Sequence, residues 1–189
     1  MADTTIYAHG AFAGLSGGPG SGGSNMNVTV VGGMYGVDYS ETQPAATIVG
    51  FTLINQTCAA VMYCGLMTLT VVGLQATASL DASAAAQYVA IATGMCGETG
   101  EYGDGDCKHT FPSTWNGVAS ITSQLSVVDS SLELRLTSGG SSPRPAFLIG
   151  GNQVSLENTF VRGFHSIAYF NSTAPYTFIL AVGHGCCPR

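Results

Sequence analysis

The segment from Cys96 to Cys107 holds the densest group of residues that could do chemistry. It encloses four carboxylates, Glu98, Glu101, Asp104 and Asp106. Carboxylate oxygens are the ligands that Ca²⁺ prefers, but the acids depart from the EF-hand order and the final glutamate of that motif is missing. A cluster of acids is more often a solvated surface. We therefore predict a disulfide between Cys96 and Cys107 that closes an acidic loop, with calcium binding by the four acids as the alternative.

The other four cysteines do not have the spacing of a zinc site, which needs two ligands in a short hook. Cys58 and Cys64 lie in an apolar run, where buried free thiols are common. Cys186 and Cys187 are adjacent, so we expect them to bond to different partners, including a neighbouring subunit. We expect no cofactor.

Catalysis by a nucleophile needs serine or cysteine beside histidine and an acid. The sequence has four histidines, but neither a Gly-x-Ser-x-Gly elbow nor an HExxH motif. Outside the acidic segment the carboxylates are scattered singly, which argues against a glycosidase pair. We predict that the protein is not an enzyme.

Charge is the most unusual property of the composition. Only 8% of the 189 residues are charged and 46% are hydrophobic, whereas an ordinary domain has ~25% charged residues. Such a chain is expected to hide much of its surface against other copies or a larger body. The net charge is −6 and the five basic residues are dispersed, which argues against nucleic acid and anionic membranes as partners.

The run from Cys58 to Leu74 is apolar enough to suggest a membrane helix. It is at the lower length limit for a span, it alternates threonine with aliphatic residues, and it lacks flanking Lys or Arg. We predict a buried pair of strands there. The first five residues lack the features of a secretory signal, so we expect synthesis in the host cytoplasm.

Short strand-like segments recur every 8 to 15 residues and are separated by Gly, Pro, Asn or Ser, which is typical of an all-β sandwich or barrel. We predict an antiparallel, jelly-roll-like β-sandwich of eight or nine strands. The expected strands are 26–31, 47–54, 61–73, 88–93, 117–128, 131–137, 146–149 leading to 153–156, 160–170 and 176–182. Leu132, Leu134 and Leu136 should face the core, with Glu133 and Arg135 on a wet face. The segment 80–91 is the one candidate helix.

The stretch from Gly14 to Asn25 is rich in Gly and Ser, which favours a flexible segment. We therefore predict two parts, a flexible N-terminal arm at residues 1–25 and a single β-sandwich domain at residues 26–189. Phe12, Leu15 and Met26 are the expected apolar anchors through which the arm contacts a partner.

A charge-poor β protein with an arm and no catalytic set is typical of a particle subunit. We predict a structural virion protein, a capsid decoration or cement protein of a bacteriophage, on the outer capsid surface of the virion. Its expected partners are other copies of itself, as a homotrimer, and a major capsid protein. The alternative is a receptor- or carbohydrate-binding module of a fibre or surface filament.

Overall fold

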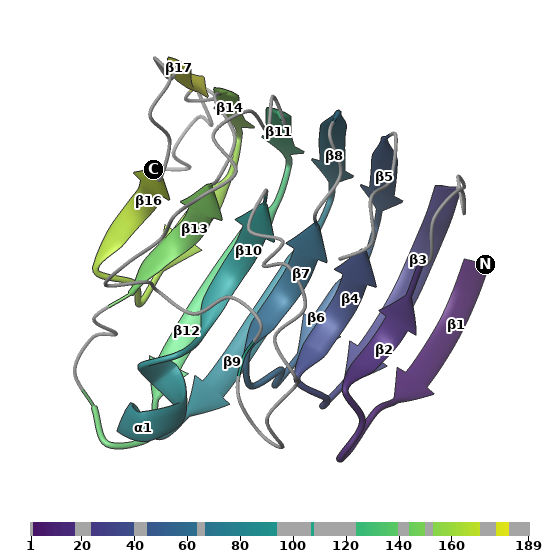
Figure 1. Ribbon diagram of the computed structural model, residues 1–189, viewed down its shortest axis with the longest axis vertical. Helices are drawn as coiled ribbons and strands as arrows, with labels where there is room; N and C mark the ends of the chain where they lie inside the picture. Colours follow the sequence, from purple (N-terminus) through teal and green to yellow (C-terminus); the bar gives the residue numbers. More distant parts are fainter. Residues whose placement is uncertain are drawn as a thin grey trace, which may run out of the picture.

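The computed structural model describes residues 2–17, 24–39, 45–63, 67–93, 107, 124–139, 144–149, 153–170 and 177–181. The strands of this part form two sheets, and within each sheet every pair of neighbouring strands is parallel (Figure 1). The larger sheet has eleven strands: β1 (Ala2–Tyr7), β3 (Ser24–Val31), β5 (Ala46–Val49), β6 (Thr52–Ile54), β8 (Thr68–Val72), β9 (Gln75–Leu80), β11 (Gln124–Val128), β12 (Ser131–Leu136), β14 (Gln153–Glu157), β15 (Phe160–Arg162) and β17 (Thr177–Ala181). The smaller sheet has six: β2 (Ala13–Ser16), β4 (Tyr35–Tyr39), β7 (Ala59–Tyr63), β10 (Val89–Thr93), β13 (Pro145–Ile149) and β16 (Ser166–Phe170).

The chain winds in successive coils, each of which stacks on the one before. In one coil β5 and β6 lie in the larger sheet and β7 in the smaller; β8, β9 and β10 of the next coil pair with them in that order. Thr29, Thr52 and Gln75 are successive partners and lie 23 residues apart. Two neighbouring parallel strands need a long connection between them. In this winding, the rest of the coil provides that connection. The architecture is a parallel β-solenoid.

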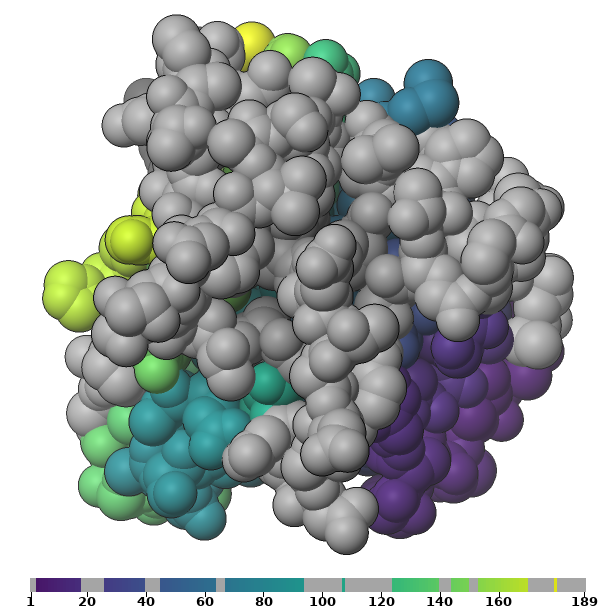
Figure 2. Space-filling model, in the orientation of Figure 1, coloured from purple at the N-terminus to yellow at the C-terminus, as the bar shows by residue number. Residues whose placement is uncertain are grey.

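The larger sheet has two arms that meet at β3, which pairs with β5 through its first residues and with β6 through its last. The first arm consists of the first residues of β3 with β5, β8, β11, β14 and β17. The second arm consists of the last residues of β3 with β6, β9, β12 and β15. Figure 2 follows the same succession of coils, with the N-terminal coil at the right of the view and the last coils, green to yellow, at the left.

One residue at each corner between the arms has a positive φ. These residues stack in register as a corner column: Asp3, Asn27, Gly50, Gly73, Asp129 and Asn158. Only Gly, and less readily Asn and Asp, adopt this conformation at low cost. The Asn158 amide donates a hydrogen bond of 2.6 Å to the Asp129 carboxylate, and Asn27 donates one of 3.2 Å to Asp3. The corner thus repeats because the sequence supplies a suitable residue in each coil.

The core lies between the sheets and is built of rows that run from coil to coil. Val30, Leu53, Ala76 and Leu132 form one such row on the second arm and are buried. Val37, Val61, Ile91 and Phe147 form the facing row in the smaller sheet. Burial of these rows supplies the main driving force for coil stacking.

The prediction of an antiparallel, jelly-roll-like β-sandwich with eight or nine strands is wrong. The expected strands do contain strands of the structure, but their partners are parallel neighbours in the adjacent coils. Gly50 and Gly73, which fall within expected strands, are corners, which redirect the chain to the next strand of its coil. Alternation of apolar and polar residues reports one buried face and carries no information on strand direction.

The apolar run from Cys58 to Leu74 forms β7 and β8, as expected. No helix in the described part of the chain is long and apolar enough to cross a membrane. Within the expected helical segment, α1 spans only Ala82–Ala85, and the Asp81 carboxylate caps it by accepting a 2.8 Å hydrogen bond from the Ala84 amide.

Candidate functional site

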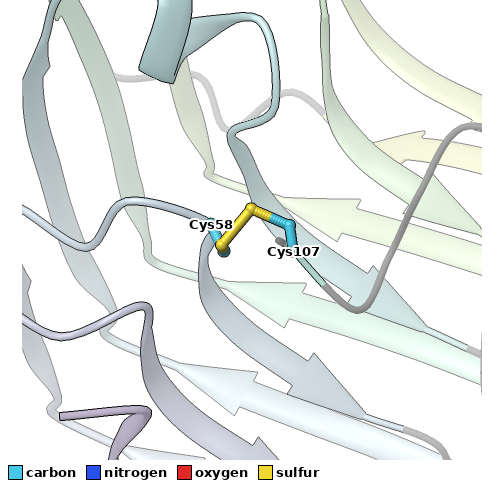
Figure 3. Close-up of a disulfide and its surroundings, with 2 residues drawn as sticks. All are labelled: Cys58 and Cys107. Atoms are coloured by element: carbon cyan, nitrogen blue, oxygen red, sulfur yellow. A yellow bond between two sulfur atoms is a disulfide. The ribbon is translucent and has the colours of Figure 1, made fainter. Parts of the chain in front are cut away.

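Cys107 forms its disulfide with Cys58, which corrects the predicted bond to Cys96 (Figure 3). A cysteine forms one disulfide, so the predicted closure of the acidic segment by Cys107 does not occur. Cys58 is also not the free thiol that we expected. It directly precedes β7, and its side chain and that of Cys107 pack with Met62, Ala92 and Leu148. The bond closes a loop over a sequence separation of 49 residues, which sequence spacing alone does not reveal.

Cys96 and the four calcium candidates, Glu98, Glu101, Asp104 and Asp106, lie outside the described residues. Within the residues that are described, no group of three or more His, Cys, Asp or Glu side chains is placed to hold a metal ion. The calcium alternative stays a prediction.

The predicted arm at residues 1–25 contains β1, β2 and the start of β3, which pair into the two sheets. Residues 18–23 of this segment lie outside the described part. The Phe12 ring packs against Tyr35 at a centroid distance of 5.1 Å, and Leu15 is partly buried against the core. Met26 is exposed. Two of the three expected anchors therefore have contacts within the chain itself.

The outer face of the smaller sheet is covered in its middle coils. Asp38, Met62, Ala92 and Leu148 are partners in successive coils, and all four are buried. They share this face with Cys58 and Cys107. The middle of this face is therefore part of the interior.

The outer face of the second arm is accessible to solvent. Two rows of side chains point outward there. The first is Thr29, Thr52, Gln75, Ser131 and Phe160, and the second is Val31, Ile54, Thr77, Glu133 and Arg162. Phe160 is an aromatic side chain whose exposed fraction reaches 55%. The Gln75 and Thr77 side chains make no hydrogen bond within the described part of the chain. We call these two rows, with Arg135, the second-arm face.

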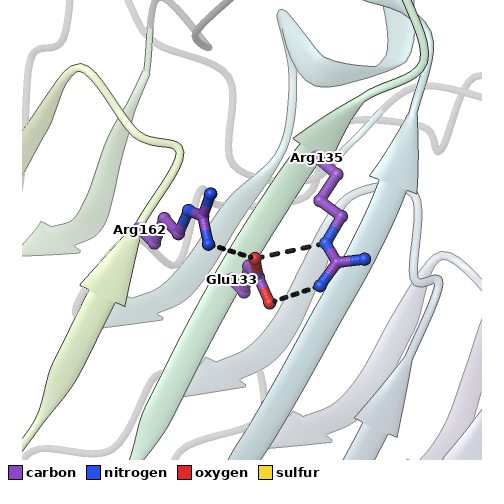
Figure 4. A network of polar contacts seen from close by, with 3 residues as sticks. All are labelled: Glu133, Arg135 and Arg162. Carbon is purple, nitrogen blue, oxygen red and sulfur yellow. Dashed lines mark hydrogen bonds and ion pairs between the residues drawn. The ribbon is translucent and has the colours of Figure 1, made fainter. Parts of the chain in front are cut away.

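A network of three charged side chains lies at the end of this face (Figure 4). The Arg135 guanidinium donates two hydrogen bonds to the Glu133 carboxylate, from Nε to Oε1 and from Nη2 to Oε2, each of 3.1 Å. Arg162 Nη1 lies 3.6 Å from Glu133 Oε1. The Glu133 side chain is 16% exposed, whereas Arg135 and Arg162 are 73% and 70% exposed. Two of the five cations of the chain thus meet at one carboxylate.

The two arginines set the electrostatics of Glu133. The hydrogen bonds from Arg135 lower the pKa of the Glu133 carboxyl, and the charges of Arg135 and Arg162 act in the same direction. Burial raises this pKa, but the effect of Arg135 is larger. Glu133 is therefore ionised at neutral pH, and the network has a net charge of +1.

Sequence reasoning identified Glu133 and Arg135 as outward-facing and missed Arg162 and Phe160. The missing signal is the coil alignment, which makes Ser131 the partner of Phe160 and Glu133 the partner of Arg162. Without it, residues 29 positions apart give no indication that they are neighbours.

Comparison of the chain with protein-family models, curated proteins and solved structures gives no match. The class that the geometry defines is a parallel β-solenoid, and its function must be argued from its outer faces.

Proposed function

We propose that the protein is a carbohydrate-binding module and that the second-arm face is its binding surface. The observation that carries this proposal is the exposed Phe160 ring on the same face as Gln75 and Thr77, whose side chains make no hydrogen bond within the described residues. A sugar ring has apolar C–H faces and a rim of hydroxyls, so it is matched by an aromatic surface beside amide and hydroxyl groups.

The shape of the face also supports the proposal. Neighbouring strands of a sheet are ~4.8 Å apart, so the outward rows present Gln75, Ser131 and Phe160 at regular intervals across three coils. An extended oligosaccharide can contact such a row at several points. Because the side chains project from paired strands, little conformational entropy is lost when they bind.

The Cys58–Cys107 disulfide is consistent with this role. Disulfides persist in oxidising surroundings, which include the extracellular space and virion surfaces where glycans are met.

The proposal is tested by applying the labelled protein to an array of oligosaccharides. We expect binding to a defined set of glycans, and a loss of affinity of about tenfold in Phe160→Ala, because an aromatic contact provides about 0.5–1.5 kcal/mol beyond the area that it buries and about 1.4 kcal/mol is tenfold. Ile179→Ala is the matched control, because Ile179 is an exposed apolar residue on the first arm. Absence of binding to every glycan, or equal losses in the two variants, would contradict the proposal.

A second candidate is the structural virion protein, such as a capsid decoration protein, that the composition suggests. One observation favours it. Ile167, Tyr169 and Ile179 are exposed apolar residues of β16 and β17, in the last coils. Exposed apolar groups of this kind are often covered by another copy or by a larger particle.

The mass of the purified protein in solution, measured by light scattering, tests this second candidate. A subunit of a symmetric particle is expected to form a closed oligomer that dissociates in Tyr169→Lys, whereas Met67→Lys, at an exposed site in a middle coil, keeps the oligomer. A monomer at all micromolar concentrations would count against self-assembly and favour the binding module.

A further inference from the structure

We propose that Arg135 and Arg162 form a subsite for an anionic group, a carboxylate or a sulfate, on the bound saccharide. This inference rests on the proposed carbohydrate-binding function and names the class of sugar that the face takes. The juxtaposition that carries it is two exposed guanidiniums flanking one carboxylate, on the same face as Phe160.

The charge distribution supports the subsite. Glu133 neutralises one of the two cations, which leaves an excess of one positive charge at this end of the face. The whole chain has a net charge of −6, so an anion meets attraction at this site against the average repulsion of the molecule. The residues of the second-arm face before β9 are Thr29, Val31, Thr52 and Ile54, and none of them is charged, so the charged side chains of this face lie at its other end.

The donors of both arginines remain available. Arg135 uses Nε and Nη2 to bind Glu133, and its Nη1 group makes no hydrogen bond in the described part of the chain. The 3.6 Å ion pair of Arg162 is longer than a hydrogen bond, and its guanidinium donates none within the same part. A guanidinium presents N–H groups in a planar fork that matches the oxygens of carboxylate or sulfate.

Glu133 competes with a ligand anion for these donors. It accepts both hydrogen bonds from Arg135, and its negative charge offsets one of the two guanidiniums. Exposed ion pairs contribute little to folding stability, so the network is poorly explained as a stabilising device. Phe160 precedes Arg162 by two residues on β15, so both side chains point to the same side. A sugar ring on Phe160 thus places its substituents towards Arg162.

The experiment measures affinities of the intact protein for three probes by titration calorimetry: an oligosaccharide of uronic acids, the same oligosaccharide with its carboxyl groups reduced to alcohols, and a sulfated neutral oligosaccharide. We expect the carboxylated or the sulfated probe to bind at least about tenfold more tightly than the reduced one. The comparison of these two probes identifies which anion is bound. Arg162→Gln and Arg135→Gln should remove the preference, and Glu133→Gln should tighten anion binding because it removes the competing charge.

Glu157→Gln is the matched control for a change of charge, because Glu157 is exposed at the end of β14 on the first arm. It should leave the preference unchanged. Circular dichroism melts establish that each variant is folded, and Arg162→Lys, which keeps the charge without the fork, should retain part of the preference.

Equal affinity of the reduced and acidic probes would overturn the subsite and leave the carbohydrate-binding function standing. Weaker anion binding in Glu133→Gln would also contradict it. If no probe binds and the glycan array is negative, the proposed function fails, and this inference fails with it.

Discussion

The outer faces of the smaller sheet and of the second arm differ although both belong to the same coils. On the smaller sheet, Met62, Ala92 and Leu148 are buried and pack with the disulfide-bonded Cys58 and Cys107. On the second arm, Gln75, Thr77 and Arg162 face solvent. A solenoid repeats its inner rows because each coil must pack on the next, but its outer rows are free to diverge. The buried outer face therefore contributes to stability, and the open one is available for binding.

The largest loss of folding stability is expected from removal of the disulfide on the covered face. Replacing Cys58 and Cys107 together with serine removes a cross-link that spans 49 residues, worth about 4 kcal/mol by the chain-entropy relation. Urea unfolding of the variant, followed by circular dichroism, should show this loss. Wild-type protein unfolded in the presence of a reductant should match the variant, and a variant as stable as the oxidised protein would contradict the role given to the bond.

The next largest effect on stability is expected when one side chain on each of the two faces is shortened to alanine. Met62→Ala leaves a cavity beneath the covered face and should cost about 3 kcal/mol, whereas Thr77→Ala on the second-arm face should change stability by less than about 0.5 kcal/mol. The midpoints of thermal unfolding provide the measurement. Similar losses for the two substitutions would mean that the faces do not differ as described.

The turn from the second arm to the smaller sheet depends on Gly163. Its φ is +87°, and a Cβ atom there would lie 1.8 Å from the Leu134 carbonyl oxygen. Gly163→Ala should therefore destabilise the protein by more than about 2 kcal/mol. Gly139→Ala shares the positive φ but has open space around it, so its cost should be only about 1 kcal/mol. Equal costs would show that the close approach at Gly163 is unimportant.

The smallest expected effect concerns the pKa of Glu133 on the open face. Since the Glu133 pKa is lowered in the folded state, its interactions stabilise the protein above the ordinary carboxyl range and are lost as the pH falls through the folded pKa. An NMR titration of the Glu133 carboxyl should have its midpoint below that of an unperturbed glutamate. Arg135→Gln should raise this midpoint more than Arg162→Gln, because the hydrogen bonds from Arg135 are the largest cause of the shift. The reverse order would contradict the geometry.

The sequence located most strands but not their partners. The segments Val28–Val31, Phe51–Ile54 and Leu74–Thr77 occupy equivalent positions in three coils, each 23 residues after the last. The same alignment puts Asn27, Gly50 and Gly73 at one corner. The 23-residue period is not evident from the sequence, because the next pair of partners, Gln75 and Ser131, lies 56 residues apart.

The candidate site depends on the same register. Alternation around Leu132 and Leu134 correctly predicted a wet face with Glu133 and Arg135. The pairing of β12 with β15, which brings Arg162 to Glu133, is a long-range property that local patterns do not encode. The same holds for Cys58 and Cys107, since spacing favoured the nearer Cys96.

Hydrogen exchange of the backbone amides, measured with and without a glycan that the array identifies, tests directly whether the second-arm face binds saccharide. We predict added protection at β9, β12 and β15, with β7 and β10 of the covered sheet unchanged. Protection confined to the smaller sheet, or to the first arm, would contradict this prediction.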